Sequence, residues 1–188
     1  PRMAPLDVLA GAKAVNVPVV MYHFLRVVAN PQRDKMGWNL SVTPEDFALQ
    51  LAFLKREGFT TVSLSDVMNA MEAGAQLPKR PIVLTFDDGY ANFATVGAPL
   101  LARAGFTGTD FVVSDFVGKP GFMSADQVRQ VAAMGMTVGA HTQHHVDLAR
   151  IPVGVAEQEI FGSRTALQLL TGQLVSDFAY PSGKFNQQ

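Results

Sequence analysis

The stretch RPIVLTFDDGYANF, residues 80–93, contains the pattern that decides the fold of this chain. A β-branched, apolar run typical of a buried strand ends in two adjacent acids and a glycine, and a helix-like segment follows. An Asp-Gly pair after a strand is often a tight turn. Two neighbouring carboxylates also repel each other unless a positive group lies near them. The stretch is therefore open to two interpretations, a turn or a functional site.

Apolar runs typical of strands alternate with helix-like segments along the chain. We expect strands at 17–25, 60–64, 80–86, 107–113, 137–141 and 175–181. We expect helices at 44–57, 65–74, 91–105, 124–136 and 152–172, and a surface loop at 26–40. This alternation predicts an α/β fold with a mostly parallel sheet, either open or closed into an incomplete barrel. In both architectures ligands bind at the carboxyl ends of the strands.

Local signals mark the starts of two of these helices and a break inside a third. Thr43 is a predicted N-cap, with Pro44 at the first helical position, and Ser124 is expected to begin a later helix. Pro99 is expected to kink or split the helix at 91–105, because proline has no backbone N–H to donate.

Composition narrows the class of protein. The 188 residues, 48% hydrophobic and 16% charged, are typical of one globular domain. A net charge of −1 argues against a nucleic-acid partner, and no apolar run reaches the roughly 20 residues of a transmembrane segment. The absence of cysteine excludes disulfides and thiolate metal sites. Residues 1–16 form an expected lead-in segment that lacks the apolar core of a signal peptide, and the oligomeric state stays open.

Three of the four histidines lie in GAHTQHHVDL, residues 139–148, directly after a predicted strand. His141 and His145 are four residues apart, so one helical turn or a compact loop can direct both toward one point. The stretch is either a polar surface loop or part of a metal site. Catalytic zinc usually has three nitrogen or oxygen ligands and one open position. Two histidines and one aspartate complete that set, and the second aspartate is free to act as a general base.

The motifs TFDDGY, HTQHH and FAYPSGKFN, in this order, resemble those of the NodB-type polysaccharide deacetylases, carbohydrate esterase family 4. The similarity runs from about residue 17 to residue 186. It implies an irregular, incomplete (β/α) barrel that removes N-acetyl groups from amino sugars with a divalent metal, most often zinc and sometimes cobalt, nickel or iron. Residues 17–188 would form this catalytic domain, truncated at its C-terminal end, because family members usually continue beyond the position of Gln188.

The resemblance assigns roles to the acids and histidines of the two motifs. Asp87 matches the general base, and Asp88, His141 and His145 match the metal ligands. His144 falls at a position that varies in the family, and we favour a structural role for it.

The stretch MYH, which ends at His23, adds a more specific resemblance. It is similar to the strand that precedes the TFDDG motif in deacetylases of poly-β-1,6-N-acetylglucosamine. In that branch a histidine of this strand is the catalytic acid, so the match assigns His23 to protonation of the leaving amine. The alternative is an ordinary residue at the end of a strand. Ala179 stands where many family members have arginine, and AYP is familiar in this branch.

The third motif supplies candidates for substrate contact. Ser182 stands where most members have tyrosine, yet its backbone N–H, or that of Tyr90, can still donate to an oxyanion. Further candidates for contact with the sugar, each of which can instead pack in the core, are Tyr180, Pro181, Tyr22 and Trp38.

The expected function is metal-dependent removal of N-acetyl groups from an N-acetylglucosamine-containing polysaccharide. The resemblance implies a periplasmic, secreted or cell-envelope location. Two alternatives stay open. Ser182, the early C-terminus and Ala125, where an aromatic residue is frequent, favour a catalytically weak glycan-binding relative. The same metal scaffold could also hydrolyse a small non-sugar amide or ester.

Overall fold

The computed structural model describes residues 13–186, so most of the predicted lead-in segment lies outside the described residues. Its central sheet is parallel and places β5 (Pro81–Asp88) in the middle. The strand order is β1 (Val19–Tyr22), β5, β6 (Thr109–Val112) and β7 (Thr137–Ala140), with β4 (Thr60–Thr61) paired to the start of β5. The apolar run of β5 is almost entirely buried because the sheet is covered on both faces.

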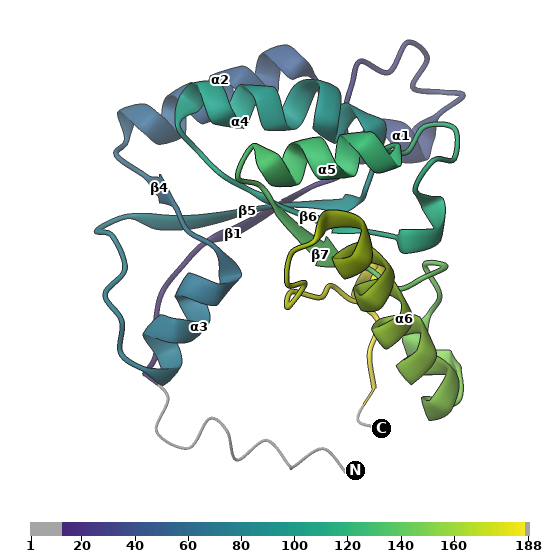
Figure 1. Cartoon of the computed structure of the whole chain (residues 1–188). Helices are drawn as coiled ribbons and strands as arrows, with labels where there is room; N and C mark the ends of the chain where they lie inside the picture. Colours follow the sequence, from purple (N-terminus) through teal and green to yellow (C-terminus); the bar gives the residue numbers. More distant parts are fainter. Residues whose placement is uncertain (1–12, 187–188) are drawn as a thin grey trace.

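Helices cover the sheet from several sides (Figure 1). Three lie together on one side of it: α2 (Pro44–Arg56), α4 (Ala98–Ala104) and α5 (Ala125–Ala133). Helix α3 (Leu64–Glu72) lies on the opposite side, and α6 (Val153–Thr171) packs beside β7. Phe47, Phe86 and Phe93 are fully buried between these helices and the sheet. The core thus fixes β5, and with it the two acids at its end.

The predicted α/β class with a mostly parallel sheet is confirmed. Within the described part of the chain the sheet runs from β1 to β7 without closing, as in an incomplete barrel. The predicted helix starts are also correct: the side chains of Thr43 and Ser124 accept N–H bonds from Asp46 and Gln127.

The region between residues 17 and 42 differs from the expectation in two ways. The expected single strand at 17–25 is broken at His23 into β1 and β2 (Phe24–Leu25). The expected loop at 26–40 contains α1 (Lys35–Leu40), followed by β3 (Ser41–Val42), which pairs with β2. The turn of helix forms because Asp34, held by Arg26 at 2.7 Å, accepts the N–H of Gly37.

The expected helix at 91–105 is split, as the proline predicted. A π-helical segment, Phe93–Gly97, leads into α4, and Pro99 lies in the first turn of α4, where its missing N–H costs little.

The expected final strand at 175–181 is wrong. It is reduced to one bridge between Ala140 and Phe178, followed by a 3₁₀ turn, Pro181–Gly183. Pro181 cannot donate a ladder hydrogen bond, and the positive φ of 56° at Ser182 turns the chain away.

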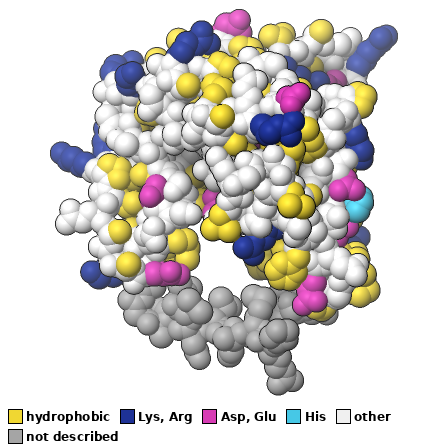
Figure 2. Space-filling view, in the orientation of Figure 1, with side chains coloured by type: hydrophobic (Ala, Val, Ile, Leu, Met, Phe, Trp, Pro, Cys, Tyr) yellow, Lys and Arg dark blue, Asp and Glu magenta, His cyan; other side chains and the backbone are white. Residues whose placement is uncertain are grey.

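Charge and hydropathy of the surface agree with the composition. None of the helices between residues 13 and 186 is long and apolar enough to cross a bilayer. On the face shown in Figure 2, acidic and basic side chains are interspersed, and neither sign gathers into one patch.

Candidate active site

The candidate site lies at the carboxyl ends of the parallel strands. Asp88 is in register with Val112, and Val112 with Ala140, so β5, β6 and β7 end at one level. His141 follows β7 directly, and His23 occupies the break after β1. These side chains line a cleft of about 1000 Å³ together with Asp87 and His145. The topology thus brings the predicted acids and histidines to one edge of the sheet.

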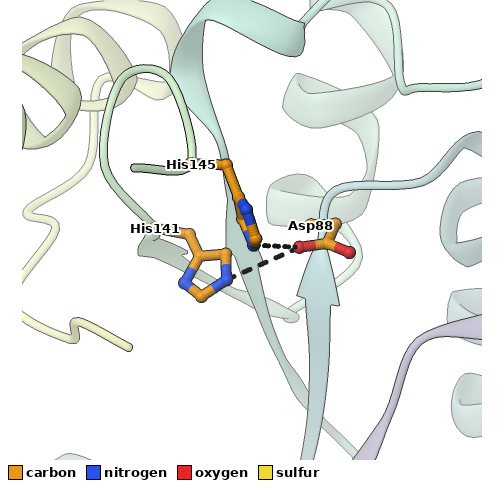
Figure 3. Close-up of side chains that lie close together, drawn as sticks. All are labelled: Asp88, His141 and His145. Atoms are coloured by element: carbon orange, nitrogen blue, oxygen red, sulfur yellow. Dashed lines mark ion pairs between the residues drawn. The ribbon is translucent and has the colours of Figure 1, made fainter. Parts of the chain in front are cut away.

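Asp88, His141 and His145 converge within this cleft (Figure 3). Asp88 Oδ1 lies 3.5 Å from His141 Nε2 and 3.2 Å from His145 Nε2. Ligands about 2.1 Å from a tetrahedral zinc ion stand about 3.4 Å from one another, close to these separations. The same Oδ1 atom is buried and makes no hydrogen bond of normal geometry. The three residues therefore fit a divalent metal ion, and this oxygen is the atom that such an ion would satisfy.

The orientation of His141 suits a metal ligand. Its Nδ1 atom lies 2.8 Å from the carbonyl oxygen of Ala179. A carbonyl only accepts, so Nδ1 carries the proton and the lone pair of Nε2 is directed toward Asp88. Only the backbone of residue 179 is needed for this contact, so the alanine found there does not disturb it.

The electrostatics of the three residues support a shared cation. Burial alone would raise the pKa of Asp88, but the neighbouring rings of His141 and His145 lower it well below its usual value. The nearby carboxylate of Asp88 in turn raises the pKa of His145, because it stabilises the protonated ring. Asp88 thus favours its ionised form, and the raised pKa of His145 indicates a place that stabilises positive charge, which a metal cation would supply.

Unfavourable backbone conformations are concentrated at this site. Among the described residues, the non-glycine positions with positive φ are Asp88 (77°), Thr142 (66°), His145 (59°) and Ser182 (56°). Such conformations cost on the order of 1–3 kcal/mol each and persist where surrounding contacts enforce them. All four lie in or beside the cleft.

Asp87 and His23 lie next to each other in the cleft and are not part of the cluster of Asp88, His141 and His145. Asp87 precedes Asp88 at the end of β5 and lines the same cleft, and the pairing of Tyr22 with Phe86 sets His23 level with it. His23 Nε2 lies 3.9 Å from Asp87 Oδ2, beyond hydrogen-bonding distance. Burial raises the pKa of Asp87, and the charges of His141 and His23 partly oppose that increase.

The candidate substrate residues separate into two groups. Tyr90, Tyr180 and Ser182 line the cleft, and Tyr180 is 46% exposed. Pro181 is buried beside it. The other two aromatic candidates lie elsewhere: Tyr22 stacks on Phe86 in the core, and Trp38 lines a separate groove.

The polysaccharide deacetylase family model matches residues 74–188. This chain belongs to the polysaccharide deacetylase family. The deacetylase PplD of Streptococcus pyogenes, solved in complex with acetate, is 29% identical with a TM-score of 0.86, covering 93% of this chain and 77% of that one. The predicted resemblance to the NodB-type deacetylases is confirmed.

Curated relatives of this family member are longer than the chain. YxkH of Bacillus subtilis is 22% identical over 176 residues, which cover 94% of this chain and 60% of that protein. The poly-β-1,6-N-acetyl-D-glucosamine N-deacetylase of Escherichia coli K12 is 39% identical over 62 residues, 33% of this chain and 9% of that protein. The chain therefore spans less than two thirds of these relatives.

Two buried acids near the site were missed by the sequence-based prediction. Glu159 on α6 contacts the loop of residues 141–145. It could have been found because it lies on the same buried stripe of the helix as Ser163 and Leu167, where an acid is unusual. Asp110 in β6 is fully buried, and neither carboxylate oxygen has a hydrogen-bond partner. Burial raises the pKa of Asp110, and the nearby charges of Asp87 and Asp88 raise it further.

Proposed function

We propose that residues 17–188 form the catalytic domain of a metal-dependent hydrolase that removes N-acetyl groups from an N-acetylglucosamine-containing polysaccharide. The observation that carries the proposal is the cluster of Asp88, His141 and His145 beside Asp87 and His23. Membership in the polysaccharide deacetylase family supports the same reaction.

Asp88, His141 and His145 would hold the metal ion. Two imidazole nitrogens and one carboxylate oxygen are typical ligands of catalytic zinc, so we propose zinc. Imidazole also binds cobalt, nickel and iron, which are the alternatives. When bound, such a cation lowers the pKa of water and polarises a carbonyl oxygen.

Asp87 and His23 would carry the two proton transfers. Asp87 takes a proton from the attacking water, and its raised pKa makes it a stronger base than an exposed aspartate. His23 gives a proton to the amide nitrogen as the bond to the acetyl carbon breaks, because an unprotonated amide nitrogen is a poor leaving group. The products are acetate and a free amine on the sugar. Because 3.9 Å separates the two side chains, no hydrogen bond joins them, and each is available to exchange a proton with the substrate or with water.

The walls of the cleft would orient the sugar. The backbone N–H of Ser182 or of Tyr90 is the proposed donor to the oxyanion, since both residues line the cleft. Half-exposed Tyr180 can stack on a sugar face, and Pro181 supports the turn that presents it.

The glycan and the location are proposed from the relatives. The similarity to the Escherichia coli protein, named as an N-deacetylase of poly-β-1,6-N-acetyl-D-glucosamine, favours a polymer of that chemical class. A polysaccharide of this kind implies a periplasmic, secreted or cell-envelope location for the enzyme.

The test is acetate release from β-1,6-linked N-acetylglucosamine oligomers by the purified chain loaded with zinc. We expect release that a chelator abolishes and added zinc restores. Binding of the oligomer without acetate release would overturn the enzyme proposal in favour of a glycan-binding relative. Hydrolysis of a small cyclic amide or a simple ester, with no release from the oligomer, would overturn the choice of substrate.

A further inference from the structure

The loop that carries both histidine ligands, residues 141–145, is tied to helix α6 through one side chain, Glu159. Glu159 Oε2 accepts the backbone N–H groups of Gln143 and His144, each at 3.0 Å. Glu159 Oε1 lies 2.7 Å from His144 Nδ1, the third contact of the same carboxylate with this loop. One acid therefore holds two consecutive peptide groups between the two predicted metal ligands.

The burial of Glu159 shows that these contacts matter to the fold. The residue is only 8% exposed and lies on the inward stripe of α6 with Ser163 and Leu167. A buried carboxylate is strongly unfavourable unless hydrogen-bond donors surround it. The loop supplies such donors, so the acid and the loop satisfy each other.

The other side of the loop is also held. The carbonyl oxygens of Thr142 and Gln143 accept the N–H groups of Ser114 and Asp115 at 3.2 and 3.1 Å. The loop therefore lies between the segment after β6 and helix α6, and its peptide groups are bonded in both directions.

The conformation enforced in this way is an unfavourable one. Thr142 and His145 both have positive φ, and the N–H of His145 donates to the Thr142 hydroxyl at 2.9 Å. Non-glycine residues keep such angles only where neighbouring contacts leave no alternative. Without Glu159, the N–H groups of Gln143 and His144 would lose the acceptor that holds the loop in this conformation.

We propose that Glu159 is a positioning residue for the metal site. By accepting the N–H groups of residues 143 and 144, it holds the loop so that the rings of His141 and His145 face Asp88. The inference rests on the proposed metal site, and Glu159 acts through the backbone without touching the metal.

His144 has a different place in this arrangement. Its ring bridges Glu159 and Asp115, with Nε2 at 3.1 Å from Asp115 Oδ2, and it is not part of the Asp88 cluster. A structural role for His144 was the sequence-based preference, and these contacts support it.

The test compares zinc affinity among three substitutions of Glu159 by competition with a chromophoric chelator. Glu159→Ala removes the acceptor and should weaken zinc binding about 10- to 100-fold, as loss of residues that orient metal ligands usually does. Glu159→Gln keeps an acceptor oxygen at the same reach and should stay within about threefold of the wild type. Glu159→Asp keeps the charge but is one methylene shorter, so it should resemble alanine. Glu157→Ala, an exposed acid on the same helix, is the matched control and should change nothing.

A second measurement separates this inference from the proposed function. Hydrogen exchange in the metal-free chain should show that Glu159→Ala or Glu159→Asp loses protection at the amides of Gln143 and His144, while Glu159→Gln keeps it. If the wild type binds no zinc, the proposed metal site fails, and exchange still tests the contact with the loop.

Two results would overturn the inference. One is zinc affinity within twofold of the wild type in both the alanine and the aspartate variants. The other is full affinity with aspartate but weak binding with glutamine, which would assign the effect to charge and not to the reach of the acceptor. Where the alanine variant does not fold, the aspartate variant decides the outcome.

Discussion

Replacing His23 with glutamine is the sharpest test of the proposed acid. Glutamine keeps a polar side chain of similar length but has no proton to transfer at neutral pH. His23 follows the last ladder pair between β1 and β5, Tyr22 with Phe86, so the substitution leaves the sheet intact. Its ring makes no hydrogen bond to Asp87, since 3.9 Å separates Nε2 from Oδ2. The variant should therefore fold and keep its metal site.

The expected loss depends on the leaving group. General acid catalysis contributes about 10²- to 10⁴-fold, or about 3–5 kcal/mol of the barrier. Deacetylation of an N-acetylglucosamine oligomer needs this proton, so its kcat should fall by that factor. Hydrolysis of 4-nitrophenyl acetate needs little protonation, because nitrophenolate is a good leaving group, and its kcat should fall by less than about fivefold. The ratio of amide to ester rates should thus drop by at least about 20-fold.

The assay measures acetate release and nitrophenolate absorbance on the same zinc-loaded preparations. Asp87→Asn is the matched control, because loss of the base should slow both substrates alike while metal binding is retained. Equal losses on both substrates in the His23 variant would refute the assignment of His23 as the acid.

The remaining predictions concern two proposed metal ligands, Asp88 and His145, and one buried acid, Asp110. Asp88→Asn should reduce zinc affinity by at least about 100-fold, measured as metal content after dialysis, because a charged ligand is lost; undiminished content would exclude Asp88 as a ligand. Asp88 raises the pKa of His145, so the stabilisation from this pair is complete below about pH 6.5 and is lost as pH rises through the folded-state value. The Tm of the metal-free chain should accordingly fall as pH rises above about 6.5, and His145→Gln should remove this dependence. Burial raises the pKa of Asp110, so the folded state disfavours its ionised form and this cost to stability grows as pH rises above the unfolded-state pKa. Asp110→Asn should increase the free energy of unfolding at pH 7 by about 1–3 kcal/mol, and by less near pH 4, in urea titrations; a decrease at pH 7 would contradict the buried, unpartnered environment.

Much of the fold could be predicted because its signals are local. The apolar run ending at Asp88 and the caps at Thr43 and Ser124 depend on residues a few positions apart, and all three were found where expected. The prediction was wrong at two segments, residues 26–40 and 175–181. Helix α1 forms because Arg26 holds its capping acid, and the final strand is lost because Pro181 and Ser182 turn the chain.

The sequence by itself determined the chemistry available to this protein: adjacent acids after a strand, histidines four residues apart after another, and the family motifs that contain them. Only the tertiary structure decided how these groups are combined. Parallel register brings Asp88 level with the histidine loop, and the pairing of β1 with β5 sets His23 beside Asp87. Glu159 meets the loop across 15 and 16 residues of chain, a contact that no local pattern records, because packing of α6 beside β7 creates it.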